Sequence, residues 1–314
     1  MKKKILFIII LCLLSLGVYA KNNSTLRIPF TLSEDGYIVL DFSHSKEIFQ
    51  LEFSLVTENS QFYKVAIPKI TKSYFDDDRD LKEIIVEIFM NQENVDYAEA
   101  EKIVSEELKN NGLHINPDLS IDNITFSNRD FFVQFDWSAN NLTDGCIGLP
   151  FFTNVENIFI DYKESYIEIN SKIKGKNSIL LYNMPDTDFY SDLKLAYIIA
   201  ELNGIQQPFI ITCLPVSSAR KDINSSYIYK GEEFWNIVND STEINLEYNT
   251  DFEAEITVGN VSDKINIIKY SDDKISTNEL SGRKIFQLYN SLGNDFFKDK
   301  RILVDYMHKK FYIW

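Results

Sequence analysis

Apolar and polar residues alternate with a period of two along several parts of the chain. The clearest stretch is 49–55, and the same alternation recurs at 131–137 and at 252–258. This pattern is typical of strands with one buried face. Two further stretches, 38–40 and 195–199, are continuously apolar, which suits central strands. The sequence therefore predicts a mainly β protein.

A helical pattern interrupts the first half of the chain. From Asp80 to Met90, apolar residues recur on one side of a helix. A second amphipathic stretch, from about Tyr97 to Leu108, ends at Asn111-Gly112, a sequence suited to a helix C-cap. The second half offers only a short helix at 232–238. We therefore expect a helical insert in the first half.

Two parts of the chain, about 145 residues apart, have nearly the same sequence order. In 148–162, Gly and two Phe lead to an apolar strand ending in Asp-Tyr, and 293–306 repeats this order. A repeat of this length indicates two copies of a small domain. Pro29 lies 24 residues before Phe53, and Pro185 lies 24 residues before Phe209, so spacing makes the prolines equivalent. We place the lobes at 21–170 and 171–314.

The first 20 residues have the pattern of a signal peptide. Three lysines, Lys2 to Lys4, precede an apolar run at 5–16, and Ala20 ends a small-residue cleavage pattern. The run is short for a membrane span, so none is expected in the mature chain. The mature protein is predicted to begin near Lys21 and to be exported, either to the periplasm or to the cell exterior.

Charge and composition exclude several classes of function. The chain has 32 basic and 47 acidic residues, a net charge of −15. Cleavage removes three lysines, so the mature chain has 29 − 47 = −18. Such acidity argues against nucleic acids and anionic membranes as partners. The three histidines lack metal-ligand spacing, and no catalytic or phosphate-binding signature is present, so we expect neither metal nor cofactor.

Motifs in both halves resemble those of one family. Asp144-Gly145-Cys146-Ile147-Gly148 precedes the first repeated ending, and Ser291-Leu292-Gly293 precedes the second. Together they resemble the apolar-apolar-Gly motifs of two-lobed aspartic proteases, especially the retropepsin-like proteins of bacteria. The resemblance covers nearly all of the mature chain. It implies two tandem aspartic-protease-like β-barrel lobes, with the helical insert in the first.

The catalytic loops depart from the family pattern. Each lobe of the family carries an apolar-apolar-Asp-Thr-Gly loop. By spacing, the corresponding residues here are Val56-Thr57-Glu58 and Thr212-Cys213-Leu214. Aspartic proteolysis needs two carboxylates about 3 Å apart that share one proton. Neither Val56 nor Thr212 can replace them. In the family, the threonines of the two loops hydrogen-bond across the lobes. The resemblance implies that Thr57 keeps this position in the first loop and that Cys213 replaces the matching threonine in the second. We therefore predict no catalytic residue.

Three functions stay open at this point. The favoured one is a catalytically inactive protein that binds a peptide or protein partner in the cleft between its lobes. A second is an aspartic-type endopeptidase with displaced acids, for which Glu58 and Asp144 are the candidates. A third is a structural subunit of a surface assembly. The helical insert either closes over the cleft or packs as a decoration.

Two cysteines, Cys146 and Cys213, remain after cleavage, and both fall in motifs expected near the cleft. An exported protein can join such a pair, but one pair is not a disulfide framework. A nucleophilic cysteine needs a positioned base, and no histidine lies in these motifs. Buried free thiols are the favoured interpretation.

Overall fold

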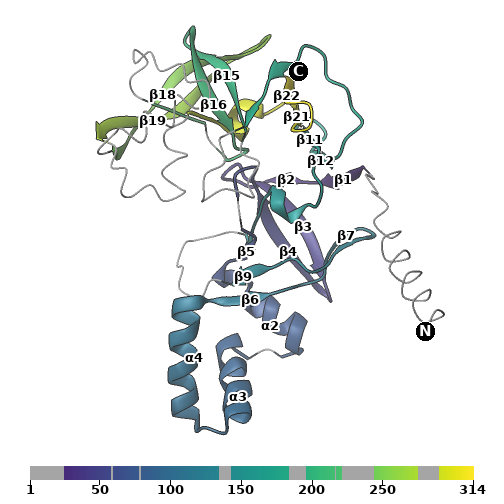
Figure 1. The fold of residues 1–314 in the computed structure, drawn as a ribbon, viewed down its shortest axis with the longest axis vertical. Helices are drawn as coiled ribbons and strands as arrows, with labels where there is room; N and C mark the ends of the chain where they lie inside the picture. Colours follow the sequence, from purple (N-terminus) through teal and green to yellow (C-terminus); the bar gives the residue numbers. More distant parts are fainter. Residues whose placement is uncertain are drawn as a thin grey trace, which may run out of the picture.

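The computed structural model describes residues 25–57, 59–77, 79–133, 143–183, 196–215, 217–220, 244–274 and 290–314. The expected signal peptide, Glu58, Pro185 and the short helix at 232–238 lie outside these ranges. The described chain is mainly β, as predicted, and its strands form two curled sheets and a third sheet shared between them (Figure 1).

The first lobe is built on a sheet of nine strands within the described residues. Alternation explains its centre, since Phe49, Leu51 and Phe53 are fully buried on one face while their neighbours point away. The strands are β2 (Thr31–Leu32), β3 (Ile38–His44), β4 (Glu47–Phe53), β5 (Gln61–Phe62), β6 (Leu113–Ile115), β7 (Leu119–Ile121), β8 (Ile124–Phe126), β9 (Phe131–Val133) and β10 (Gly145–Ile147).

Three helices follow β5 and the short turn η1 (Lys64–Ala66). They are α2 (Ile67–Phe75), α3 (Leu81–Glu93) and α4 (Tyr97–Asn111). The last two confirm the predicted insert. Asp80 caps α3 by accepting a bond from Lys82 N, and Gly112 ends α4 at φ 65°. The sequence analysis missed α2, although Pro68 in its first turn is a helix-start signal.

The second lobe forms a sheet that closes on itself. Its path runs β14-β15-β16-β20-β17-β19-β18, and β18 pairs back to β15 through Glu201 with Thr257 and Leu202 with Ile256. The strands are β14 (Tyr182–Asn183), β15 (Ala196–Leu202), β16 (Ile205–Ile211), β17 (Ser218–Arg220), β18 (Ile244–Val258), β19 (Val261–Lys274) and β20 (Asn290–Leu292). The short helix α7 (Asn294–Phe297) follows β20.

A six-stranded antiparallel sheet joins the lobes, in the order β1-β12-β11-β21-β22-β13. The first lobe supplies β1 (Leu26–Pro29), β11 (Asn157–Asp161) and β12 (Tyr166–Ile169), and the second supplies β13 (Ile179–Leu180), β21 (Arg301–Asp305) and β22 (Lys310–Ile313). The turn η2 (Leu149–Phe151) precedes β11. The inner face of this sheet and the apolar faces of both lobes form one continuous core.

The repeated endings meet at the centre of the shared sheet. Phe159 of β11 lies opposite Leu303 of β21, Ile158 lies opposite Val304, and Ile160 lies opposite Ile302. In the repeat, Ile158, Phe159 and Ile160 correspond to Ile302, Leu303 and Val304. Phe159 therefore pairs with its own counterpart, while Ile158 and Ile160 each pair with the counterpart of the other, so the pairing is symmetric. The repeat found in the sequence is therefore a repeat in space, and its two copies pair with each other.

Hydrogen bonds just after the first strand of each lobe, β1 and β13, correct the expected equivalence of Pro29 with Pro185. Phe30 N donates to Ser165 O at 3.0 Å, and Leu181 N donates to Lys309 O at 3.0 Å, so these two sites match. The residue that corresponds to Pro29 is therefore Leu180 rather than Pro185. The chain between β2 and β3 spans 33–37, whereas the chain between β14 and β15 spans 184–195. This difference in length shifts the spacing on which the equivalence depended.

Candidate functional site at the junction of the lobes

Each lobe contains a pair of parallel strands that ends at the junction. In the first lobe β10 lies parallel to β4, with Ile147 opposite Phe53. In the second lobe β20 lies parallel to β16, with Leu292 opposite Ile211. The apolar-apolar-Gly motifs, Cys146-Ile147-Gly148 and Ser291-Leu292-Gly293, thus end beside the strands that enter the two loops. This is the order of elements that the family resemblance implies.

The parallel pairs show which loop residues correspond. Ser54 N donates to Ile147 O at 3.2 Å, and Thr212 N donates to Leu292 O at 3.0 Å. Ser54 and Thr212 are therefore equivalent, and Val56 corresponds to Leu214. The expected equivalence of Val56 with Thr212 is wrong by two residues, because it rested on Pro29 and Pro185. Sequence reasoning missed Ser54, which directly follows the alternating strand β4.

Ser54 and Thr212 connect the lobes at this point. The Ser54 hydroxyl donates to Thr212 O at 3.1 Å, and Leu55 N donates to the same carbonyl oxygen at 3.0 Å. The Thr212 hydroxyl donates to Leu292 O at 2.9 Å. Ser54 is 4% exposed and Thr212 is 2% exposed. Both hydroxyl protons are thus directed at main-chain carbonyls inside a buried contact.

The two loops also contain partly exposed residues. Val56 and Thr57 follow Ser54, and Leu214 follows Cys213, all at intermediate exposure. A Cβ added to Gly148 would lie 1.8 Å from Thr57 O, so only glycine lets the two segments approach this closely. Val56 N donates to the Ser54 hydroxyl at 3.1 Å, and Leu214 N donates to the Thr212 hydroxyl at 3.2 Å. The two loops therefore fold in the same way locally.

Asn294 is a second link between the lobes, and the sequence analysis did not identify it. Its Nδ2 donates to Gly36 O of the first lobe at 2.8 Å and to Cys213 O of the second at 2.9 Å. Its Oδ1 accepts from the Tyr162 hydroxyl at 2.7 Å. Asn294 is 3% exposed, so these bonds satisfy a buried amide. No pattern in the sequence distinguishes it from a surface asparagine.

Both predicted free cysteines are buried thiols. Burial raises the pKa of Cys213 to about 12, although the Tyr162 hydroxyl bonds to it and opposes the shift. Burial also raises the pKa of Cys146. A thiol with a raised pKa is a poor nucleophile at neutral pH. The interpretation of these residues as small apolar side chains fits their surroundings.

A cluster of ionisable groups surrounds Glu52 on β4. Glu52 lies two residues before Ser54, on the strand face opposite the core. Its carboxylate accepts from the Thr143 hydroxyl at 2.6 Å and from the Tyr63 hydroxyl at 3.4 Å. Burial raises the pKa of Glu52, and these two hydroxyls oppose the shift. Burial and the nearby Glu52 likewise raise the pKa of Tyr37.

Asp144, one of the two displaced-acid candidates, lies away from the junction. It is three residues before Ile147, which is roughly 10 Å along a strand. Lys69 of α2 contacts Asp144 Oδ2 at 2.6 Å, and Gln50 N donates to the same oxygen at 2.8 Å. Asp144 therefore anchors α2 to the sheet. The other candidate, Glu58, lies outside the described residues.

The histidines do not supply a base or a metal site at the junction. His114 contacts Asp130 at 2.8 Å, His308 contacts Asp305 at 2.9 Å, and His44 bonds to Asp118 O at 3.0 Å. His44 lies at the end of the β3–β4 hairpin that is opposite to Ser54, where it is paired with Glu47. In the part of the chain that the structure describes, no three His, Cys, Asp or Glu side chains gather as a metal site.

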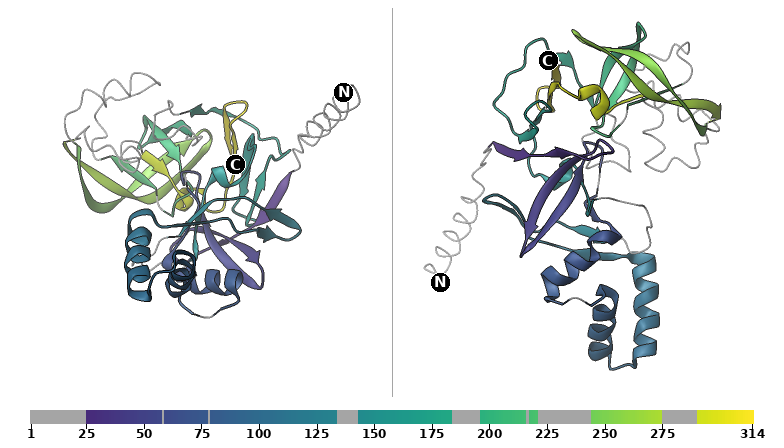
Figure 2. Two further views of the ribbon diagram at one scale, coloured as in Figure 1. Left: turned by 60° about the horizontal axis from the view of Figure 1, so that its bottom comes forward. Right: turned by 180° about the vertical axis from the view of Figure 1, so that it is seen from behind.

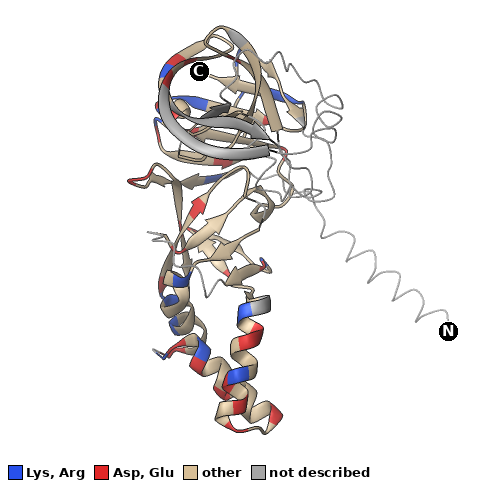
Figure 3. Cartoon of the chain, turned by 90° about the vertical axis from the view of Figure 1, so that its left-hand side faces the viewer, with Lys and Arg blue, Asp and Glu red and all other residues tan. Residues whose placement is uncertain are grey.

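The helical insert lies at the end of the first lobe that is remote from the second (Figures 1 and 2). Helices α3 and α4 pack on each other through Val86, Ala100 and Val104. Their outer surfaces carry charges of both signs (Figure 3). The insert therefore does not close over the junction. The alternative expectation, that these helices pack as an addition to the β core, is correct. Among the described residues, no helix has both the length and the apolar character needed to cross a membrane.

Comparisons with known proteins give a likeness in structure only. No family model matches the sequence, and no curated protein matches it. Among solved structures, one similar chain is that of the aspartic proteinase from Irpex lacteus. The alignment covers 92% of this chain and 97% of that one, at 10% identity and a TM-score of 0.48. A likeness at this identity and TM-score indicates nothing about activity.

Proposed function

We propose that this chain is an exported, catalytically inactive protein of aspartic-protease-like build that binds a peptide or protein partner between its lobes. The observation that supports inactivity is the bonding of Ser54 and Thr212. Ser54 directly follows β4, and Thr212 directly follows β16. The hydroxyl of each residue donates to a main-chain carbonyl oxygen. Two proton-sharing carboxylates would be needed at such a position for aspartic proteolysis.

Other catalytic chemistry has little support at this position. A serine or threonine nucleophile needs a base within hydrogen-bond reach. The partners of the Ser54 and Thr212 hydroxyls are carbonyl oxygens, which cannot accept a proton at ordinary pH. Asp144 is held by Lys69, and this ion pair does not favour the displaced-acid alternative.

The Glu52 cluster supports a binding role beside the junction. Glu52 is a half-buried carboxylate, and its bonds to Thr143 and Tyr63 come from neutral hydroxyls. Among the described residues, no lysine or arginine forms an ion pair with it. A partly buried carboxylate is stabilised by a cation or by N–H donors. A partner that brings a basic side chain or a main-chain N–H close to Glu52 would supply them.

Activity is tested first, on the mature protein comprising residues 21–314. The protein is incubated with denatured casein and with a peptide library from pH 3 to pH 7, and cleavage is followed by mass spectrometry. We expect no cleavage at any pH. Cleavage that pepstatin abolishes would refute the proposal. Cleavage that disappears in the Glu58→Gln, Asp144→Asn double variant would establish the displaced-acid alternative.

Binding is tested with a phage-displayed random peptide library. Selected peptides are expected to be enriched in Lys or Arg and to lose at least tenfold in affinity for the Glu52→Gln variant. Asp41→Asn is the matched control, because Asp41 lies on the same sheet face further from Ser54. Equal affinities for both variants would refute this binding position. A defined oligomer without peptide binding would favour the structural-subunit alternative.

Export is tested by expressing the full chain and sequencing the secreted or periplasmic product from its N-terminus. We expect the product to begin at Lys21. Retention in the cytoplasm with Met1 intact would contradict this part of the proposal.

A further inference from the structure

A cavity of about 700 Å³ lies at the shared sheet, on the path of the linker that joins the lobes. Its walls come from β11 and β12 of the first lobe, from β21 and β22 of the second, from the linker at 173–177, and from the turn at 259–261. The linker lies close on the sheet, since a Cβ at Gly175 would be 2.4 Å from the Tyr312 ring. This volume is within the range of small-molecule sites.

Aromatic rings form part of the cavity wall. Phe159 is stacked on Trp314, with ring centroids 5.8 Å apart and an interplanar angle of 23°. Tyr166 lies 5.6 Å from Phe159. Trp314 is 38% exposed, although a ring of this size is usually covered. These flat apolar faces suit a ligand that contains a ring system.

The cavity is positively charged on an acidic protein. The side chains that line it include those of Lys174, Lys176 and Arg301 but a single acidic one, that of Asp161, so the lining side chains sum to 3 − 1 = +2. The whole chain has a net charge of −15. Among the described residues, neither lysine forms an ion pair. The exposed Glu164, outside the lining, also acts on Arg301.

Asp161 is already neutralised by its own contacts. Arg301 Nε donates to Asp161 Oδ2 at 2.6 Å, while Lys163 N and Glu164 N donate to Oδ1 at 3.0 Å. Asp161 is 2% exposed. A ligand anion would therefore meet the two lysines and the partly exposed Arg301 guanidinium rather than a free carboxylate.

We propose that this cavity binds a small amphipathic anion, in which a ring system carries a carboxylate or sulfonate group. The ring lies against the partly exposed Trp314, which is stacked on the buried Phe159, and the anionic group faces Lys174 and Lys176. Because both lobes and the linker form the walls, an occupant contacts both halves of the protein at once. This site is separate from the junction at Ser54 and does not depend on the proposed function.

The proposal is tested with 1-anilinonaphthalene-8-sulfonate, which joins aromatic rings to a sulfonate. Binding to the mature protein is measured by calorimetry at low salt, where charge contributions are least screened. We expect one site per chain and weaker binding of the neutral analogue N-phenyl-1-naphthylamine. Energy transfer from tryptophan to the probe should fall in Trp314→Phe.

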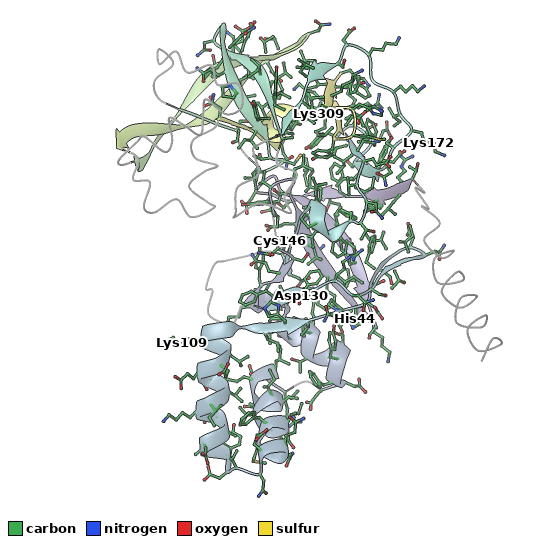
Figure 4. All side chains as sticks on the ribbon, viewed as in Figure 1. His44, Lys109, Asp130, Cys146, Lys172 and Lys309 are labelled. Atoms are coloured by element: carbon green, nitrogen blue, oxygen red, sulfur yellow. The ribbon has the colours of Figure 1, made fainter. Side chains whose placement is uncertain are left out.

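Two pairs of variants separate this site from general attraction. Lys174→Glu with Lys176→Glu should weaken probe binding at least tenfold. Lys172→Glu with Lys309→Glu makes the same charge change at exposed lysines outside the lining (Figure 4) and should change it less than twofold. Val261→Trp, which fills the cavity from its wall, should abolish binding. The proposal is overturned if the probe does not bind, if both pairs have equal effects, or if the neutral analogue binds equally well.

Discussion

The Tyr162 hydroxyl donates a 2.7 Å hydrogen bond to Asn294 Oδ1, and this buried contact joins the end of β11 in one lobe to the start of α7 in the other. In the first copy of the repeat, Leu149 stands at the position of Asn294. The amide therefore belongs to one copy alone. It adds polar links beside an aromatic contact, in which Phe30 and Phe297 pack on the Tyr162 ring.

Asn294→Leu, which restores the residue of the first copy, should destabilise the protein by about 2–4 kcal/mol, because the three partners of a buried amide lose their bonds. Tyr162→Phe removes only one of these bonds and should cost about 1 kcal/mol. Chemical denaturation of both variants measures the difference. Equal effects would show that the bonds to Gly36 and Cys213 contribute nothing.

Gly148→Ala should be more damaging than its size suggests. The new methyl group would lie 1.8 Å from Thr57 O, so the main chain must move, and we expect a cost of about 2–3 kcal/mol. Gly204→Ala is the control. No atom lies within 4 Å of its added Cβ, and only its φ of +81° opposes the change, at about 1 kcal/mol. Thermal unfolding of the two variants should rank them in this order.

Introducing acids at the junction should give a protein that is sensitive to pH. In a Ser54→Asp, Thr212→Asp variant, burial and mutual repulsion would raise the carboxyl pKa values above those of the unfolded chain. The folded state then holds the protons more tightly, so stability falls as the pH rises from 4 to 7. Ser54→Asn with Thr212→Asn lacks the charges and should show no such added dependence. Parallel melting curves for the two variants would contradict this expectation.

Glu52 should weaken the fold as the pH rises. Burial raises its pKa, so its contribution to stability is complete below the pKa of the unfolded chain and is lost as the pH passes the folded value. Glu52→Gln removes this loss. The variant should therefore gain stability relative to the wild type between pH 4 and pH 7, which melting temperatures across that range would measure. A difference that is constant with pH would mean that Glu52 ionises as it does in the unfolded chain.

The thiols of Cys146 and Cys213 should resist modification in the folded protein. Both are buried, and burial raises the pKa of each. A thiol reagent such as dithionitrobenzoate at pH 8 should label neither residue until guanidinium unfolds the chain, after which both should react. Failure of the unfolded chain to react would reveal a disulfide, against the structure.

Much of the fold was accessible from the pattern of the sequence. Alternation located β4, β9 and β18, a continuously apolar run located β3, and helical spacing located α3 and α4. The repeated Gly-to-Tyr endings predicted two lobes. These features are local, so a short window of residues carries each of them. The pairing of the two endings in one sheet followed from the structure alone, since it joins residues about 145 positions apart.

The site was located less well, and strand geometry explains the error. A slip of two residues leaves every side chain of a strand on the same face, so alternation cannot detect it. Pro29 and Pro185 gave the same spacing to the loops, and the unequal connections at 33–37 and 184–195 made that agreement accidental. Only the two parallel ladders, β4 with β10 and β16 with β20, identify Ser54 as the structural counterpart of Thr212.

The symmetric pairing of β11 with β21 has a consequence for the protein's separate halves. A polypeptide ending near Asn170 would leave β11 with an uncovered edge whose complement is β21 of the other half. The two halves, 21–170 and 171–314, produced as independent chains, should bind to each other along that edge and form the shared sheet again. The covalent connection between them would then serve mainly to raise their local concentration.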